Sequence, residues 1–199
     1  AVQFVDGFLV VASTGYDATQ WRSGFISILE PSTQRLVSTH RTSHLNPQRI
    51  LTTENDVYII NTGTYDFSNF DRPSSKTPGG VDHIPITQLA TTTDNLAPLS
   101  IDLNPLVAPI DGLTLTDGQF AFTSGLEPKV LLIKEGTTSI GLPTNQATGL
   151  GSMARWRDWF IVVDFNSDMA FFLTQAGELE CAVNLGEFET EMEGAISPV

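Results

Sequence analysis

Positive charge is scarce in this sequence, and it has no long apolar segment. The 199-residue chain has 10 Lys and Arg residues against 23 Asp and Glu residues, which gives a formal net charge of −13. Because such a chain repels phosphate backbones and anionic lipid surfaces, we expect no nucleic-acid partner. The longest apolar runs, residues 8–12 and 159–163, are far shorter than the ~20 residues of a membrane helix. We therefore expect no membrane insertion.

Cysteine is nearly absent as well, since Cys181 is the single one and can form no internal disulfide bond. No His or Lys adjoins it, and we interpret it as a small apolar strand residue rather than a nucleophile. The sequence also lacks a serine nucleophile elbow, a P-loop and a Cys-x-x-Cys motif. Few lysines, many Thr, Ser and Gly residues and the acidic balance favour an extracytoplasmic protein, either periplasmic or secreted.

Helical periodicity is missing throughout the chain. No stretch keeps an apolar period of 3.6 residues over the ~11 residues of an average helix. The 16 glycines and 11 prolines instead interrupt the sequence every few residues, which is typical of turns between short strands. We therefore predict an all-β fold with almost no helix.

A strand-like phrase that begins with aspartate occurs four times. It reads DGFLVVA from Asp6, DVYIINT from Asp56, DGQFAFTS from Asp117 and DWFIVVD from Asp158. A second apolar run follows each phrase, and shorter segments lie around the pair, so each unit offers four short strands. Four-stranded units that recur every ~40 to 60 residues predict a β-propeller of about four blades, in a single domain over residues 1–199.

Two structural alternatives stay open at this point. A β-sandwich is the competing fold, although it gives no reason for the repeated aspartate phrase. The C-terminal sequence EGAISPV resembles the segment that precedes the aspartate in the other units, so it would complete a blade with the N-terminal strands and close a four-blade ring. Equally, the four units fit a portion of a larger propeller.

Two segments resemble the YVTN/NHL/SMP-30-like class of β-propellers. They are LNPQRILTTENDVYIINTG, residues 45–63, and SGFISILEPSTQRLVST, residues 23–39. In the first, Asn-Pro, a short run and a polar turn precede a strand that ends near glycine, and in the second a Pro/Ser/Thr turn joins two strands. The resemblance implies the propeller fold and does not by itself assign a function.

Residues just before the first strand of each blade converge on one mouth of the central channel in a propeller. Those positions hold Asn46, Asp111 and Glu193, with Asn145 as a further candidate in the third unit. Their carboxylate and amide oxygens suit a polar ligand or a divalent cation such as calcium. SMP-30-like lactonases hold a metal at such a mouth with Glu, Asn and Asp ligands, so the resemblance implies a metal-dependent hydrolase as an alternative function. Turn formation by Asn before Pro and by Asp before Gly is the other explanation of these residues.

Two long segments, residues 64–80 and 91–110, interrupt the second unit and have no place in a minimal blade. Recognition usually resides in loops of this kind on a rigid scaffold. We also expect Trp21 to lie in an exposed loop beside Arg22, as an anchor for a partner. Together these features predict a non-enzymatic binding or scaffold module for a protein partner or a small polar ligand.

Other polar and aromatic residues are given structural roles. Residues 164–168, DFNSD, begin like an EF-hand calcium loop but lack its later Gly and Glu, so we interpret them as an Asx-stabilised hairpin turn. The histidines His40, His44 and His83 have no carboxylate or cysteine at metal-ligand spacing, and we expect them to be solvated or capping groups. The aromatic residues of the last unit are expected to pack between blades: Trp156, Trp159, Phe171 and Phe172.

Overall fold

The computed structural model describes residues 1–16, 20–66, 74–91, 99–101, 109–115, 120–124, 129–133, 137–141, 149–164 and 166–186. Its elements are strands β1 to β18 and one short 3₁₀ turn, η1 (Ile86–Gln88). No helix within these ranges has the length and apolar character needed to cross a bilayer.

Sixteen of the strands form four antiparallel sheets of four strands each. The first sheet contains β1 (Val2–Val5), β2 (Phe8–Tyr16), β3 (Trp21–Glu30) and β4 (Arg35–Leu45). The second contains β5 (Pro47–Thr52), β6 (Asp56–Asn61), β9 (Gly80–Pro85) and β10 (Leu99–Ile101). The third contains β11 (Pro109–Thr114), β12 (Phe120–Ser124), β13 (Lys129–Ile133) and β14 (Thr137–Gly141). The fourth contains β15 (Leu150–Trp156), β16 (Trp159–Asp164), β17 (Met169–Thr174) and β18 (Leu179–Asn184).

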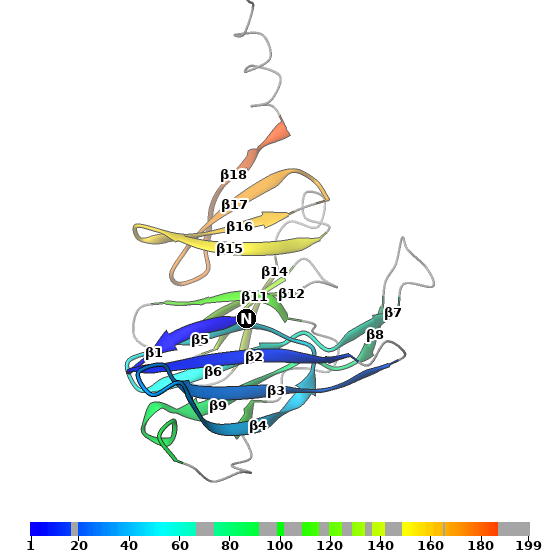
Figure 1. Ribbon diagram of the computed structural model, residues 1–199. Helices are drawn as coiled ribbons and strands as arrows, with labels where there is room; N and C mark the ends of the chain where they lie inside the picture. Colours follow the sequence, from blue (N-terminus) through cyan, green and yellow to red (C-terminus); the bar gives the residue numbers. More distant parts are fainter. Residues whose placement is uncertain are drawn as a thin grey trace, which may run out of the picture.

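The sheets follow one another as the blades of a propeller do. The first strands of successive sheets lie next to each other, because β1 contacts β5, β5 contacts β11, and β11 contacts β15. Figure 1 shows the fourth sheet at the top of the view and the first and second sheets in its lower part, with β11 and β12 between them. The prediction of an all-β propeller with four four-stranded blades is therefore confirmed, and the sandwich alternative is not.

The repeated aspartate marks the turn from the first strand of a blade to the second. Asp6 and Gly7 form the turn between β1 and β2 with φ values of 46° and 83°, and glycine adopts such positive values without strain. Arg157, with φ of 55°, and Asp158 form the same connection between β15 and β16. Asp56 is the first residue of β6, and Asp117 lies outside the described residues.

Each of the inner strands β5, β11 and β15 carries a β-bulge near its beginning. The register shifts between Pro47 and Arg49, between Pro109 and Gly112, and between Leu150 and Met153. A bulge adds one unpaired residue and bends its strand. The bulges therefore set the direction of the polar side chains at the beginnings of the inner strands.

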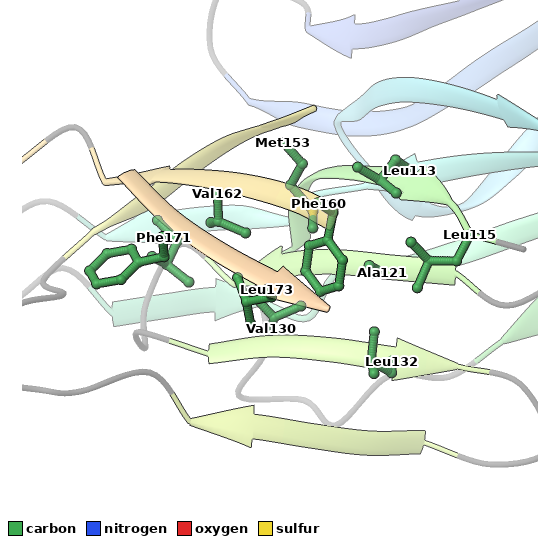
Figure 2. Close-up of a cluster of buried hydrophobic side chains, with 11 residues drawn as sticks. Leu113, Leu115, Ala121, Val130, Leu132, Met153, Phe160, Val162, Phe171 and Leu173 are labelled. Carbon is green, nitrogen blue, oxygen red and sulfur yellow. The ribbon is translucent and has the colours of Figure 1, made fainter. Parts of the chain in front are cut away.

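Three apolar clusters fill the spaces between successive sheets. Val10, Ile26 and Ile28 of the first sheet pack with residues of the second, including Ile59. A smaller cluster joins the second and third sheets. Between the third and fourth sheets, Phe160 belongs to one cluster with Ala121 and Leu132, and Figure 2 shows its ring beside the strand that carries Ala121. Full burial of one such side chain contributes about 1.5–3 kcal/mol, so packing between blades is the main source of stability.

Two details of the blades differ from the sequence interpretation. The segment 91–110 was expected to have no place in a minimal blade, but it contains β10, the fourth strand of the second blade. That segment therefore supplies a blade strand and is not wholly an insertion. The first blade has its own inner strand in β1, whereas residues 193–199, which were expected to complete a blade, lie outside the described residues.

Candidate functional site

Asp111 lies in the bulge of β11, where its carboxylate connects three blades. Its Oδ2 accepts a hydrogen bond from the backbone N–H of Met153 in the fourth sheet, at 3.0 Å. Its Oδ1 accepts from the N–H of Gly112 at 2.8 Å and lies 3.2 Å from Nε of Arg49 in the second sheet. Because both carboxylate oxygens already interact with hydrogen-bond donors, the surroundings of Asp111 are those of a structural residue that connects neighbouring blades.

Asn46 directly precedes β5 and has a positive φ of 61°. Its Oδ1 accepts a hydrogen bond from Nε2 of Gln48 at 2.6 Å, and its carbonyl accepts from the N–H of Thr62 at 3.0 Å. Asn46 and Asp111 thus lie at the beginnings of neighbouring inner strands and interact with different partners. No hydrogen bond is found between these two described side chains. The proposed convergence at a channel mouth stays a prediction.

The other predicted site residues are only partly described. Glu193 and Asn145 lie outside the described residues. Trp21 is the first residue of β3 and pairs with Tyr16 of β2, so its backbone belongs to a strand instead of the expected loop. In the described part of the chain, no group of three or more His, Cys, Asp or Glu side chains is arranged to hold a metal ion.

Asn46 and Asp111 lie on the face of the propeller where the inner strands begin. Two hollows lie on the opposite face, where the inner strands end. One has a volume of about 660 Å³ and lies between the ends of β1 and β5 and the beginning of η1. The other, of about 530 Å³, lies between the end of β5 and the end of β11. Both are lined by the turn that joins β5 to β6, Thr53 to Asn55, so this turn stands between them.

An aspartate, a histidine and a tyrosine lie beside this turn. His83 Nε2 is 2.6 Å from Asp56 Oδ1, and the His83 ring stacks on Tyr58 with centroids 4.8 Å apart. The Tyr58 ring also contacts Phe120 of the third sheet, at 4.2 Å. Burial, and secondarily the Asp56 charge, raise the pKa of Tyr58 above its usual value of 10.0. Its hydroxyl is therefore a neutral hydrogen-bonding group at the edge of the second hollow at neutral pH.

The Asp56 and His83 pair does not have the arrangement of a nucleophilic catalytic site. The imidazole Nε2 is already engaged by Asp56, and within the described residues no serine, threonine or cysteine side chain is hydrogen-bonded to His83. The contact with Asp56 and the stacking on Tyr58 fix the orientation of the His83 ring.

A buried polar cluster joins the first and second sheets, and sequence reasoning missed it. Asp82 of β9 is fully buried and accepts hydrogen bonds from the N–H of Ser43 in β4, at 3.0 and 3.2 Å. It also accepts from Nδ2 of Asn61 at 2.9 Å. Burial raises the pKa of Asp82, while hydrogen bonds from Ser43 and Asn61 and the nearby His44 partly oppose that rise. A signal existed in the sequence, since an aspartate and a histidine stand side by side in the otherwise apolar run GVDHIPI.

The remaining polar predictions gave mixed results. Asp164 Oδ1 accepts from the N–H groups of Asn166 and Ser167, which is the geometry expected of an Asx-stabilised turn. His40 is buried and its Nε2 lies 3.0 Å from Ser38 Oγ, so the expectation of a solvated or capping group was wrong. Register alternation on the buried face of β4 explains that position.

Comparisons with known proteins identify the fold. No family model matches the sequence, and no curated protein matches it closely. Solved structures do match, among them a chain of a mitotic checkpoint complex, with a TM-score of 0.64, 11% identity and coverage of 93% of this chain and 50% of that chain. A streptogramin B lyase matches with a TM-score of 0.54, 18% identity and coverage of 81% and 48%. A chain of a nidogen/laminin complex matches with a TM-score of 0.54, 10% identity and coverage of 92% and 78%.

Proposed function

We propose that this β-propeller chain is a non-enzymatic binding module that recognises a protein partner or a small polar ligand. It spans about half the length of the first similar structures. The observation that carries this proposal is the pair of hollows on either side of the turn from Thr53 to Asn55. Their volumes fall in the range of about 300–1,000 Å³ that is usual for ligand sites.

The charge of this face favours a cationic partner. Asp6, Glu54 and Asp56 all line the hollows, and the chain as a whole has a formal net charge of −13. Complementary charge speeds encounter and selects between partners more than it adds affinity. A protein segment that carries Lys or Arg side chains is therefore the partner that fits best.

The predicted long-loop surface is a second part of the proposal. Residues 64–80 include the two-stranded hairpin of β7 (Thr64–Asp66) and β8 (Ser74–Thr77), which projects from the side of the sheets in Figure 1. Hairpins that extend from a rigid scaffold are common contact elements. An extracytoplasmic location is proposed with it, on the composition of the chain alone.

Metal-dependent hydrolysis at the channel mouth is the competing function, implied by the resemblance to lactonase-like propellers. The contacts of Asp111 favour the binding function, because its oxygens already accept from Gly112, Arg49 and Met153. Elemental analysis of the purified protein separates the two functions. Stoichiometric, tightly held metal would support the hydrolase.

Capture of partners by the immobilised protein tests the binding function. We expect the double substitution Asp6→Asn and Glu54→Gln to reduce capture of partners and its dependence on salt, because two rim charges are lost. The control is Glu178→Gln with Glu180→Gln, which removes two exposed carboxylates from the fourth sheet, far from the hollows along the chain of sheets. Equal loss of capture in both double variants would contradict the assignment of this face.

A further inference from the structure

Asp56 supplies a carboxylate to both hollows, and a histidine lies directly behind it. Asp56 lines each of the two hollows, whereas His83 lines neither. The His83 Nε2 atom is 2.6 Å from Oδ1 of Asp56, and the two side chains are 20% and 26% exposed. A titratable ring therefore reaches the rim carboxylate without occupying the space that a partner would fill.

The contact between these two side chains can persist while its charge changes. A carboxylate only accepts hydrogen bonds, so Nε2 of His83 carries the proton that it donates to Asp56. A second proton binds the other ring nitrogen, Nδ1, and makes the imidazole cationic. Histidine is the side chain that ordinarily changes charge between about pH 5 and pH 8, where carboxylates stay ionised. The pair then has no net charge at the acidic end of this range and one negative charge at the basic end.

The ring of Tyr58 holds the imidazole in place in either charge state. It stacks on the His83 ring with centroids 4.8 Å apart and an interplanar angle of 13°. The Tyr58 ring is itself packed on Phe120 of the third sheet, at 4.2 Å. Because the face of an aromatic ring attracts a cation, this stack accommodates the imidazolium form. Protonation of His83 therefore changes the charge of the rim and requires no rearrangement of it.

Few other charged groups surround His83 in the part of the chain that the structure describes. The neighbouring strand β6 contributes Asp56 and the neutral hydroxyl of Tyr58, and the turn before β6 adds Glu54. Asp82 precedes His83 in β9, but its carboxylate is directed to Ser43 of the first sheet. The residues of β10, η1 and β12 include no titratable side chain. Asp56 is therefore the described charge that a proton on His83 affects most.

We propose that His83 makes the binding face sensitive to pH, so that a cationic partner is held when His83 is neutral and released when it is protonated. This regulation depends on the proposed function, because it requires that the rim carboxylates Asp6, Glu54 and Asp56 attract Lys or Arg side chains. When His83 is neutral, the three charges act together. When it is protonated, the imidazolium offsets that of Asp56. One elementary charge at this range from a partner near a protein surface changes affinity about three- to tenfold.

Titration calorimetry with a hexalysine peptide at about pH 5.5 and about pH 8 tests this regulation, since lysine stays cationic at both values. We expect the affinity of the wild type to be about three- to tenfold lower at the acidic pH. The matched variant is His83→Gln, which keeps an amide donor near Asp56 but takes up no proton, and it should show no such fall. His40 and His44 are retained in this variant, so an equal fall in both proteins would overturn the role of His83.

Proton release gives a second readout, which needs no variant. Binding of hexalysine to the wild type at about pH 6.5 should expel a proton from His83, because binding and protonation oppose each other reciprocally. Titration in two buffers with different heats of ionisation measures that proton. Binding without proton release would overturn the regulation and leave the proposed function intact. Failure of the peptide to bind at either pH would overturn both, because the rim would then attract no cation. Circular dichroism confirms that His83→Gln has folded.

Discussion

The carboxylate of Asp111 in the third sheet accepts a hydrogen bond from the backbone N–H of Met153 in the fourth, with an Oδ2 to N distance of 3.0 Å. The same side chain reaches Arg49 of the second sheet through its other oxygen, at 3.2 Å. One residue therefore couples three blades. The two members of the Arg49–Asp111 pair differ in exposure, because the Arg49 side chain is 52% exposed and the Asp111 side chain is 13% exposed.

Replacement of the two partners should have unequal effects on stability. Asp111→Ala leaves the N–H of Met153 without its acceptor, and we expect the free energy of unfolding to fall by about 1–3 kcal/mol. Arg49→Ala removes a half-exposed ion pair and should cost only about 0–1 kcal/mol. Urea unfolding of both single variants and the double variant measures these values and the coupling between them. A larger loss of unfolding free energy in Arg49→Ala than in Asp111→Ala would contradict this structural role of Asp111.

Metal ions should not stabilise the protein if the channel mouth is structural. We expect calcium, magnesium and manganese to leave the melting temperature of chelator-treated protein unchanged. A tightly bound ion at a hundredfold excess over its Kd would add about 2.7 kcal/mol and raise the melting temperature by several degrees. A rise that disappears in Asp111→Ala would instead support the hydrolase.

Buried Asp82 should make stability depend on pH in an unusual direction. Burial raises its pKa in the folded state above the ordinary value of 3.8, so the folded protein holds this proton more tightly than the unfolded chain does. The contribution of Asp82 to stability is therefore complete below pH 3.8 and is lost as pH rises through the folded-state pKa.

Asp82→Asn isolates that contribution, because all other carboxyl groups are common to the two proteins. We expect the free energy of unfolding of the wild type, minus that of the variant, to decline as pH rises from about 3.8 and then to level off. Urea unfolding at a series of pH values gives this difference. A difference that increases with pH would mean that the hydrogen bonds from Ser43 and Asn61 outweigh burial.

Gly112 should tolerate no side chain, because it lies where β11 passes close to two neighbours. A Cβ atom at this position would be 2.6 Å from Cδ1 of Phe122 and 2.7 Å from the carbonyl oxygen of Ala121. We expect Gly112→Ala to destabilise the protein by about 1–3 kcal/mol through overpacking. The control is Gly186→Ala, where the nearest atom is 3.4 Å away. Equal melting temperatures for the two variants would contradict this.

Local sequence patterns were enough to predict the blades and most of their strands. The aspartate phrase depends on turn-forming residues, and the short apolar runs depend on the alternation of apolar and polar residues within one strand. Both patterns can therefore be recognised in a single sequence. The strand β10 was missed because it has only three residues, which is too short to show an alternating pattern of its own. Such a strand is determined by its pairing with β9, which is not a local property.

The polar contacts between blades could not be predicted in the same way. Asp82 is separated from Ser43 by 39 positions, and Asp111 is separated from Met153 by 42. Their roles depend on how neighbouring sheets are rotated against each other, and on the bulges that direct individual side chains. The sequence indicated that Asp111 is a functional or turn residue, whereas its position between three sheets explains its contacts.

The chain-order arrangement of the sheets also has a consequence for how the molecule folds. Each blade is made from strands close in sequence, and successive blades pack on one another. Contacts of this kind close short loops, so a blade can form before its neighbours and then act as their template. Within the described residues, the second and third blades are packed on two sides and the first and fourth on one. Amide hydrogens of β2 and β17 should therefore exchange with solvent sooner than those of β6 and β12, and unfolding should begin at the ends and proceed inward.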